Sequence, residues 1–192
     1  RGTASLTAAT AATVAFMADG LIQIRVDQGA LNAEIANRGA IRADGGAVYL
    51  TASALGSLGR AVVNNTGIIE ARTVENVNGM IRLGGGDVIN TGELRAAGGD
   101  IGIDASQLVA LHGTVSAPGG RIAVLAGSVM SSGTVEAAGG QIAINAGSIY
   151  LDGRLDAGSA ATAGRIELKA RSLDVASSGA ILPERGSRTI RP

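Results

Sequence analysis

Aliphatic residues recur along the chain at two spacings, every second residue within short segments and about every 20 residues between them. The pattern is clearest over Gly92–Asp152, where successive copies each run from a glycine through a branched aliphatic residue, an alanine, a Gly-Gly corner and two further aliphatic residues. The copies begin at Gly92, Gly113 and Gly133, and a further copy begins at Gly153. A fixed period of about 20 residues is typical of stacked structural repeats. The sequence therefore predicts one structural unit that is copied and stacked.

Each copy divides into three short strands whose alternate residues point inward, joined by tight corners at which glycine supplies a positive φ. This pattern predicts an all-β fold, a parallel β-helix (β-solenoid) of about eight to nine rungs, and parallel strands joined by crossovers favour right-handed winding. Stacking should align equivalent residues in columns. The columns expected in the interior are Ile41, Ile69, Leu94, Val115, Val135 and Leu155; Val48, Ile81, Ile101, Ile122, Ile142 and Ile166; and, at a narrow corner, Ala43, Ala71, Ala96, Ala117, Ala137 and Ala157.

The whole chain is predicted to form one β-solenoid domain, residues 1–192. Its repeat is irregular at the N-terminal end, where alternation over Leu21–Val26 indicates a strand within the first two coils. Copies elsewhere are interrupted only at corners, as solenoids tolerate. The expected parts are irregular N-terminal coils at 1–38, regular coils at 39–178 with corner insertions at 56–63, 72–80 and 158–164, and a degenerate coil and tail at 179–192.

Composition narrows the classes of protein that fit this pattern. Only 2% of the residues are aromatic although 46% are hydrophobic, so alanine, valine, isoleucine and leucine must build the core. The absence of cysteine excludes disulfides and thiolate zinc sites. Sixteen basic and sixteen acidic residues leave no basic field for nucleic acid, and no apolar run is long enough to span a membrane. The chain opens on Arg1, which we interpret as a mature or excised piece.

Two sets of polar residues recur at positions that suit stacking. Asn37, Asn65 and Asn90 each precede a coil-starting glycine by two residues, which predicts a structural ladder of side-chain amides. Three residues after that glycine, Arg42, Glu70 and Arg95 alternate in charge, which would favour correct register through cross-strand pairs; a solvated face explains the same residues equally well. Neither set implies catalysis.

The candidates for chemistry are few. His112 is the only histidine and has no second histidine or cysteine with which to form a metal set, so we interpret it as a corner residue. Asp87, Asp100 and Asp104 could approach one another across neighbouring coils, as the carboxylates of glycan-cleaving β-helix enzymes do, but outward carboxylates at turns explain them better. The sequence thus predicts no catalytic residue, no cofactor and no metal site.

Three phrases, IRADGGAVYLTASAL, VVNNTGIIEARTVENVNGMIRLGGGD and GELRAAGGD, occur in this order. Together they resemble the segment of filamentous-haemagglutinin-like exoproteins that follows the secretion domain, and the resemblance covers nearly all of residues 2–178. It implies a right-handed β-helix rod belonging to a two-partner secretion system. It also implies export through a dedicated outer-membrane pore and a location outside the cell, secreted or at the bacterial surface.

The first functional hypothesis is a non-enzymatic extracellular structural protein, the rod of a secreted adhesin or filament. Because no amphipathic helix is seen at either terminus, we expect uncapped strand edges that stack end to end or continue into a longer chain. The alternative is an adhesin that binds a host receptor or glycan through its corner insertions, with Arg72, Glu75, Asn76 and Asn78 as the contact residues. A glycan hydrolase or lyase is a third, weaker hypothesis.

Overall fold

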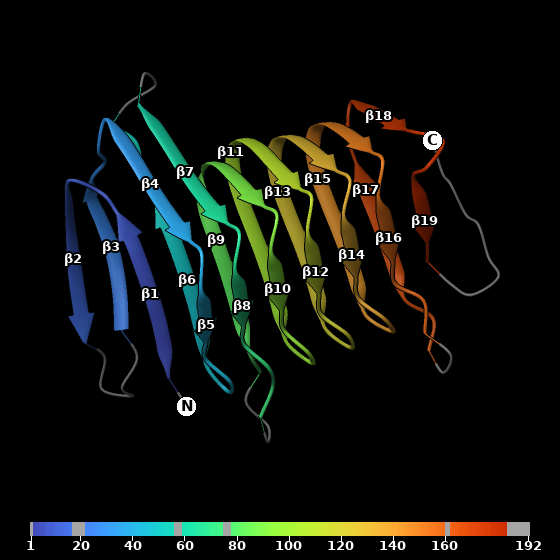
Figure 1. Ribbon diagram of the computed structural model, residues 1–192, viewed down its shortest axis with the longest axis horizontal. Helices are drawn as coiled ribbons and strands as arrows, with labels where there is room; N and C mark the ends of the chain where they lie inside the picture. Colours follow the sequence, from blue (N-terminus) through green and yellow to red (C-terminus); the bar gives the residue numbers. More distant parts are fainter. Residues whose placement is uncertain (1, 17–21, 56–58, 75–77, 160–161, 184–192) are drawn as a thin grey trace.

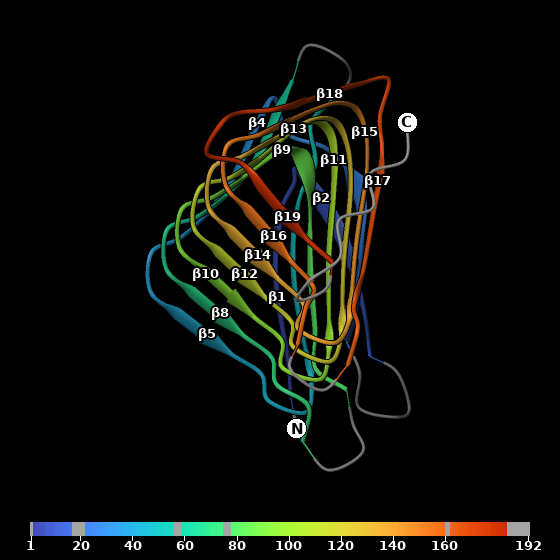
Figure 2. The ribbon, with the colours of Figure 1, turned by 90° about the vertical axis from the view of Figure 1, so that its right-hand side faces the viewer.

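The computed structural model describes residues 2–16, 22–55, 59–74, 78–159 and 162–183. Every helix or strand assigned in these segments is a β-strand. Strands of successive turns lie side by side along the long axis in Figure 1, and the chain winds round three faces when seen along that axis in Figure 2. The predicted all-β class and the parallel β-solenoid are therefore confirmed.

The three faces are built from parallel strands, and four long strands bend from the first face onto the second. In stacking order the first face contains β1 (Thr3–Ala8), β6 (Ala47–Ala52), β9 (Met80–Asn90), β11 (Asp100–Leu111), β13 (Arg121–Ser131), β15 (Gln141–Leu151) and β17 (Arg165–Lys169). The second face combines β4 (Asn32–Asn37), β7 (Arg60–Asn65) and β18 (Ser172–Val175) with the second halves of the long strands β9, β11, β13 and β15. The third face contains β5 (Ala40–Arg42), β8 (Ile68–Glu70), β10 (Glu93–Arg95), β12 (Thr114–Ser116), β14 (Thr134–Glu136), β16 (Arg154–Asp156) and β19 (Ala180–Leu182).

The stack has fewer turns than the eight to nine predicted. From β6 to β17 the chain completes about five turns, and the third face has seven strands in the part of the chain that is described. The reason is that the early turns are long. Equivalent asparagines are 28 residues apart from Asn37 to Asn65 and 25 apart from Asn65 to Asn90, whereas the later turn from His112 to Ser132 takes 20.

The predicted columns form the interior. On the third face Ile41, Ile69 and Leu94 are register partners in successive strands, and the column continues to Ile181. Val48 and Ile81 begin the equivalent column on the first face. The interior members away from the two ends are almost completely buried, and together they form one continuous hydrophobic core. This burial of aliphatic surface, level upon level, is the main source of stability for the stack.

The narrow corner beside the third face is occupied by the predicted alanine column, whose members are all buried. Each alanine is followed by a turn, as at Ala117, where the Gly120 amide donates to the Ala117 carbonyl oxygen over 3.0 Å. Gly119 lies at the third position of that turn with φ +71°, and Pro118 occupies the second. A positive φ at this position is the signature of a type II turn, which requires glycine or asparagine there. The Gly-Gly corners of the sequence therefore correspond to real turns.

The N-terminal region differs from the two irregular coils expected. β1 and β4 belong to one turn, and the chain between them forms a hairpin of β2 (Ala11–Phe16) and β3 (Ile22–Gln28). The strand predicted over Leu21–Val26 is thus present as β3, but it pairs antiparallel with β2 and not with a neighbouring coil. Leu21 itself lies outside the described residues.

The insertion predicted at 56–63 is shorter than expected. Arg60–Val63 belongs to β7, a regular strand of the second face, with Val63 in register with Ile35 and Val88. Residues 56–58 lie outside the described part of the chain. The sequence was misinterpreted here because a loop separates β6 from β7, whereas later turns run through the equivalent corner within one long strand.

Candidate functional sites

The asparagine positions form a buried hydrogen-bonded ladder on the second face. The Asn37 amide nitrogen Nδ2 donates to Asn65 Oδ1, and Asn65 Nδ2 donates to Asn90 Oδ1, each over 2.7 Å. All three side chains are less than 10% exposed. Register continues from Asn90 to Leu111, Ser131 and Leu151, as in the sequence columns. The ladder therefore ends at β11.

Ser131 occupies the ladder column without continuing it. Its side chain is buried, and its Oγ has no hydrogen-bond partner among the described residues. Leucines at 111 and 151 lie in register on both sides. This hydroxyl is a buried polar group without compensation, which costs free energy on folding.

A charged corner joins the first two strands of the third face. Arg42 Nε lies 3.2 Å from Glu70 Oε2, and Arg72 bridges Glu70 and Asp44 at 3.3 and 3.0 Å. Side-chain hydrogen bonding from Arg72, then the bond from its backbone amide, lowers the pKa of Asp44, and Asp44 in turn raises the pKa of Arg72. Arg95 is in register with Glu70 but pairs with Glu93 of its own strand. Alternating charge thus gives a cross-coil pair at one step of the column.

Of the residues predicted to form a contact surface, Arg72 and Asn78 are described and both are exposed. Arg72 is held by the charged corner, so its guanidinium is already engaged. Glu75 and Asn76 lie outside the described residues.

The three aspartates considered for glycan cleavage occupy separate register positions. Asp100 and Asp104 lie at opposite ends of a five-residue stretch of β11, and Asp87 pairs with Leu108 on the other face. In the described part of the chain no group of three or more histidine, cysteine or acidic side chains is placed to hold a metal ion.

His112 lies exposed at a corner, with Nδ1 2.7 Å from Ser132 Oγ of the next turn. A serine beside a histidine can act as a nucleophile if backbone amides stabilise the oxyanion. Here the amides of Ser132 and Gly133 both donate to the Leu111 carbonyl oxygen, at 3.0 and 2.9 Å. The two nearest amides are therefore engaged in stacking the turns.

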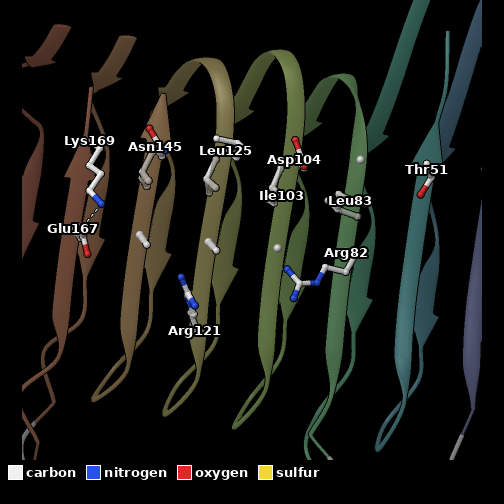
Figure 3. A pocket seen from close by; sticks show the side chains of 16 residues that line it. Thr51, Arg82, Leu83, Ile103, Asp104, Arg121, Leu125, Asn145, Glu167 and Lys169 are labelled. Carbon is white, nitrogen blue, oxygen red and sulfur yellow. Dashed lines mark ion pairs between the residues drawn. The ribbon is translucent and has the colours of Figure 1, made fainter. Parts of the chain in front are cut away.

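The sequence analysis did not identify a shallow hollow of about 500 Å³ on the outer side of the first face, shown in Figure 3. Its floor consists of the small residues Gly102, Ala123 and Ala143, which are register partners on successive strands. Charged side chains border it: Arg82, Asp104, Arg121, Glu167 and Lys169. Lys169 and Glu167 form an ion pair of 2.8 Å. Small residues at outward positions of three consecutive copies were the signal available in the sequence.

The two ends of the stack are different. At the C-terminal end the interior columns reach the surface, since Leu173 and Val175 of β18 are 44% and 41% exposed while their partners Ile149 and Leu151 are buried. At the N-terminal end the hairpin of β2 and β3 lies beyond β1 (Figure 1). Only the C-terminal end therefore presents the bare, parallel edge expected for both.

No protein-family model, curated protein or solved structure matches the chain. No helix in the part of the chain that the structure describes has the length and apolar character needed to cross a membrane.

Proposed function

We propose that this protein is a non-enzymatic structural module, a segment of the β-solenoid rod of a secreted or cell-surface protein of the filamentous-haemagglutinin-like class. The parallel solenoid supports the proposal, because the repeated positions serve stacking: inward aliphatics, corner alanines and turn glycines. The phrases that resemble that class of exoprotein lie within this stack. Passage through an outer-membrane pore and an extracellular location are part of the same proposal and rest on that resemblance.

The single observation that carries the rod hypothesis is the exposed interior at the C-terminal end. Ile166, Leu168 and Ile181 continue columns that are fully covered one level earlier, yet they are only partly buried. Leu173 and Val175 are more exposed still. An additional coil in register would cover all five side chains and satisfy the backbone groups of the edge strands. The proposed role of this edge is to continue the rod, within a longer chain or into a partner.

This role can be tested by extending the stack. Pro183 follows β19 as Ala157 follows β16, so replacing residues 184–192 by a copy of residues 118–157 adds coils in phase. The extended protein should unfold at a higher temperature, and its β17 and β18 amides should exchange more slowly with solvent. A matched control carries the same copy with asparagine at the positions equivalent to Ile122 and Ile142. Equal unfolding temperatures and equal exchange rates for the two proteins would contradict the proposed role.

The extracellular location has its own test. Antibodies raised against the purified chain should label intact cells of the source bacterium, and mild proteolysis of intact cells should remove the label. Labelling that requires permeabilised cells would rule out a surface rod.

An adhesin that binds through its corners remains the second candidate, because Arg72 and Asn78 are exposed beside a loop that interrupts the regular corner. Replacing residues 73–78 by one glycine gives Ala71-Arg72-Gly-Gly79-Met80, which matches the regular corner Ala96-Ala97-Gly98-Gly99-Asp100. Cell attachment of the purified protein should then disappear while its unfolding temperature is kept. Undiminished attachment would refute this candidate.

A further inference from the structure

We propose that the hairpin of β2 and β3 closes the N-terminal end of the stack against a second copy of this chain, so that a rod containing it can extend in one direction only. The inference rests on the proposed function, in which the C-terminal edge accepts further coils. It changes the expected end-to-end stacking of identical copies, because one of the two edges is occupied by the protein's own hairpin.

The hairpin is firmly attached at its base. The Thr10 amide and hydroxyl donate to the carbonyl oxygens of Gln28 and Gly29, each over 2.9 Å. The Ala30 amide then donates to the Ser53 carbonyl oxygen over 3.0 Å. A side chain at Gly29 would collide with the Ala54 carbonyl oxygen, so the base lies directly against the next coil.

Without the hairpin, the two ends of the chain would be compatible. Continuing the register columns places Ile166 and Leu168 of one copy on Ala4 and Leu6 of the next, since these residues belong to the same interior columns. On the third face the same operation places Ile181 on Ile41. Leu6 is 38% exposed and Ile41 is only partly buried, as expected for residues at an end of the stack. A second copy is therefore the occupant that fits this edge.

The hairpin removes this compatibility by reversing the chain direction. In Figure 1 β3 lies next to β1 and runs in the same direction, and β2 lies outermost and runs in the opposite direction. The antiparallel pairing of β2 with β3 is in agreement. An incoming β17 would have to pair antiparallel with β2 on the first face while β18 and β19 paired in parallel with β4 and β5. One coil cannot satisfy both requirements at once.

A disulfide can report head-to-tail stacking, because the chain has no cysteine of its own. Ser5 and Glu167 occupy the same outward row, at opposite ends of one molecule. In a head-to-tail junction Ser5 of one copy would neighbour Glu167 of the next at about 5 Å, which suits a disulfide. The variant S5C/E167C should therefore stay monomeric after oxidation. A ladder of disulfide-linked oligomers from this otherwise intact chain would overturn the proposal.

The complementary variant removes residues 10–29 from S5C/E167C and joins Ala9 to Ala30. The join preserves the phase, because the Ser53 amide donates to the Ala8 carbonyl oxygen and Ala30 pairs with Ala54. Oxidation should now give the ladder that the intact chain lacks. Adding Leu173→Lys and Val175→Lys to the deletion should abolish the ladder again, since these charges would be buried at the junction.

A second variant of S5C/E167C, with Gly-Ser spacers at both ends of the hairpin, frees the hairpin without deleting it, and it should also form the ladder. If the deletion variant folds and forms no ladder while the added coils stabilise the C-terminal edge, the inference is wrong and the proposed function stands. If the added coils also fail, the proposed function falls as well. Failure of both hairpin variants to fold would also overturn the inference, because the hairpin would then be part of the fold and not a removable cap.

Discussion

Asn65 is the residue through which two neighbouring turns share hydrogen bonds, since it accepts from Asn37 and donates to Asn90. Its side chain is completely buried, so each lost bond leaves a polar group without water. Stacked amides of this kind fix register, because a slip of one residue would place every side chain of the strand on the wrong face.

Asn65→Ala should destabilise the fold by about 2–4 kcal/mol, because it leaves Asn37 Nδ2 and Asn90 Oδ1 without their partners from the ladder. Ser131→Ala is the matched control in the same column. It removes a buried hydroxyl that has no partner among the described residues, so its effect should stay within about 0.5 kcal/mol. Urea unfolding of both variants measures the difference, and similar losses of stability would show that the ladder contributes nothing specific.

Gly133 illustrates a second constraint at the residue scale, the closeness of successive backbones. A Cβ atom there would collide with the Gly113 carbonyl oxygen, which is backbone and cannot move aside without separating the turns. At Gly119, in contrast, nothing lies within 4 Å of an added Cβ and only the positive φ favours glycine.

Gly133→Ala should therefore cost more stability than Gly119→Asn. We expect a loss of about 2 kcal/mol or more at Gly133 and of about 1 kcal/mol or less at Gly119, because asparagine tolerates the left-handed region. Thermal unfolding of the two variants gives the comparison. The reverse order would mean that the turn conformation limits stability more than the spacing of the coils.

At the scale of elements, one turn is a unit that can be removed. β13 and β15 are in register over their whole paired length with an offset of 20 residues, and so are β12 and β14. Each turn contacts mainly its two neighbours, as in other solenoids.

Deleting residues 113–132 should consequently give a folded protein whose stack is one level shorter, by about 4.8 Å. Deleting residues 123–132, half a period, should prevent folding because inward and outward positions no longer align. Circular dichroism and small-angle X-ray scattering distinguish the two outcomes. An unfolded 113–132 deletion would mean that the turns are not interchangeable.

The charged corner gives the third face a dependence on pH. Arg72 lowers the pKa of Asp44 in the folded protein, so the carboxylate contributes stability above its ordinary pKa of 3.8 and loses it as pH falls through the lower folded value. Asp44→Asn should flatten the fall in stability in this acid range, while Asp104→Asn, whose carboxylate forms no ion pair among the described residues, should leave it unchanged. Urea unfolding at a series of acid pH values provides the test. The effect should be modest and screened by salt, because the pair is exposed.

At the scale of the whole molecule, the columns were readable from the sequence because their members are copied at one period and buried on one side. The hairpin was not, since the Ala- and Thr-rich segment that forms β2 carries no periodic signal of its own and pairs with a strand from the same turn. β7 was missed for a related reason: the loop before it concealed its equivalence to the second half of β9. The hollow on the first face depends on which small residues become neighbours across strands, and this requires the register.

The whole stack should open from its ends. Side chains of the central coils are covered on both sides, whereas those of β17 and β18 are covered on one side only. Hydrogen exchange followed by mass spectrometry should therefore be slowest in β11 and β13 and fastest in β18 and β19. Uniform exchange along the chain would indicate a single cooperative unit.

The identical length of the later turns has a consequence for the gene. A stretch of DNA that encodes one period can be duplicated or lost by unequal recombination at any point within the repeats, and the protein keeps its phase. Such events would lengthen or shorten the solenoid without a new folding problem. The early turns, with periods of 28 and 25 residues, do not share this freedom. Variation in length among descendants of this gene should therefore be concentrated in its C-terminal half.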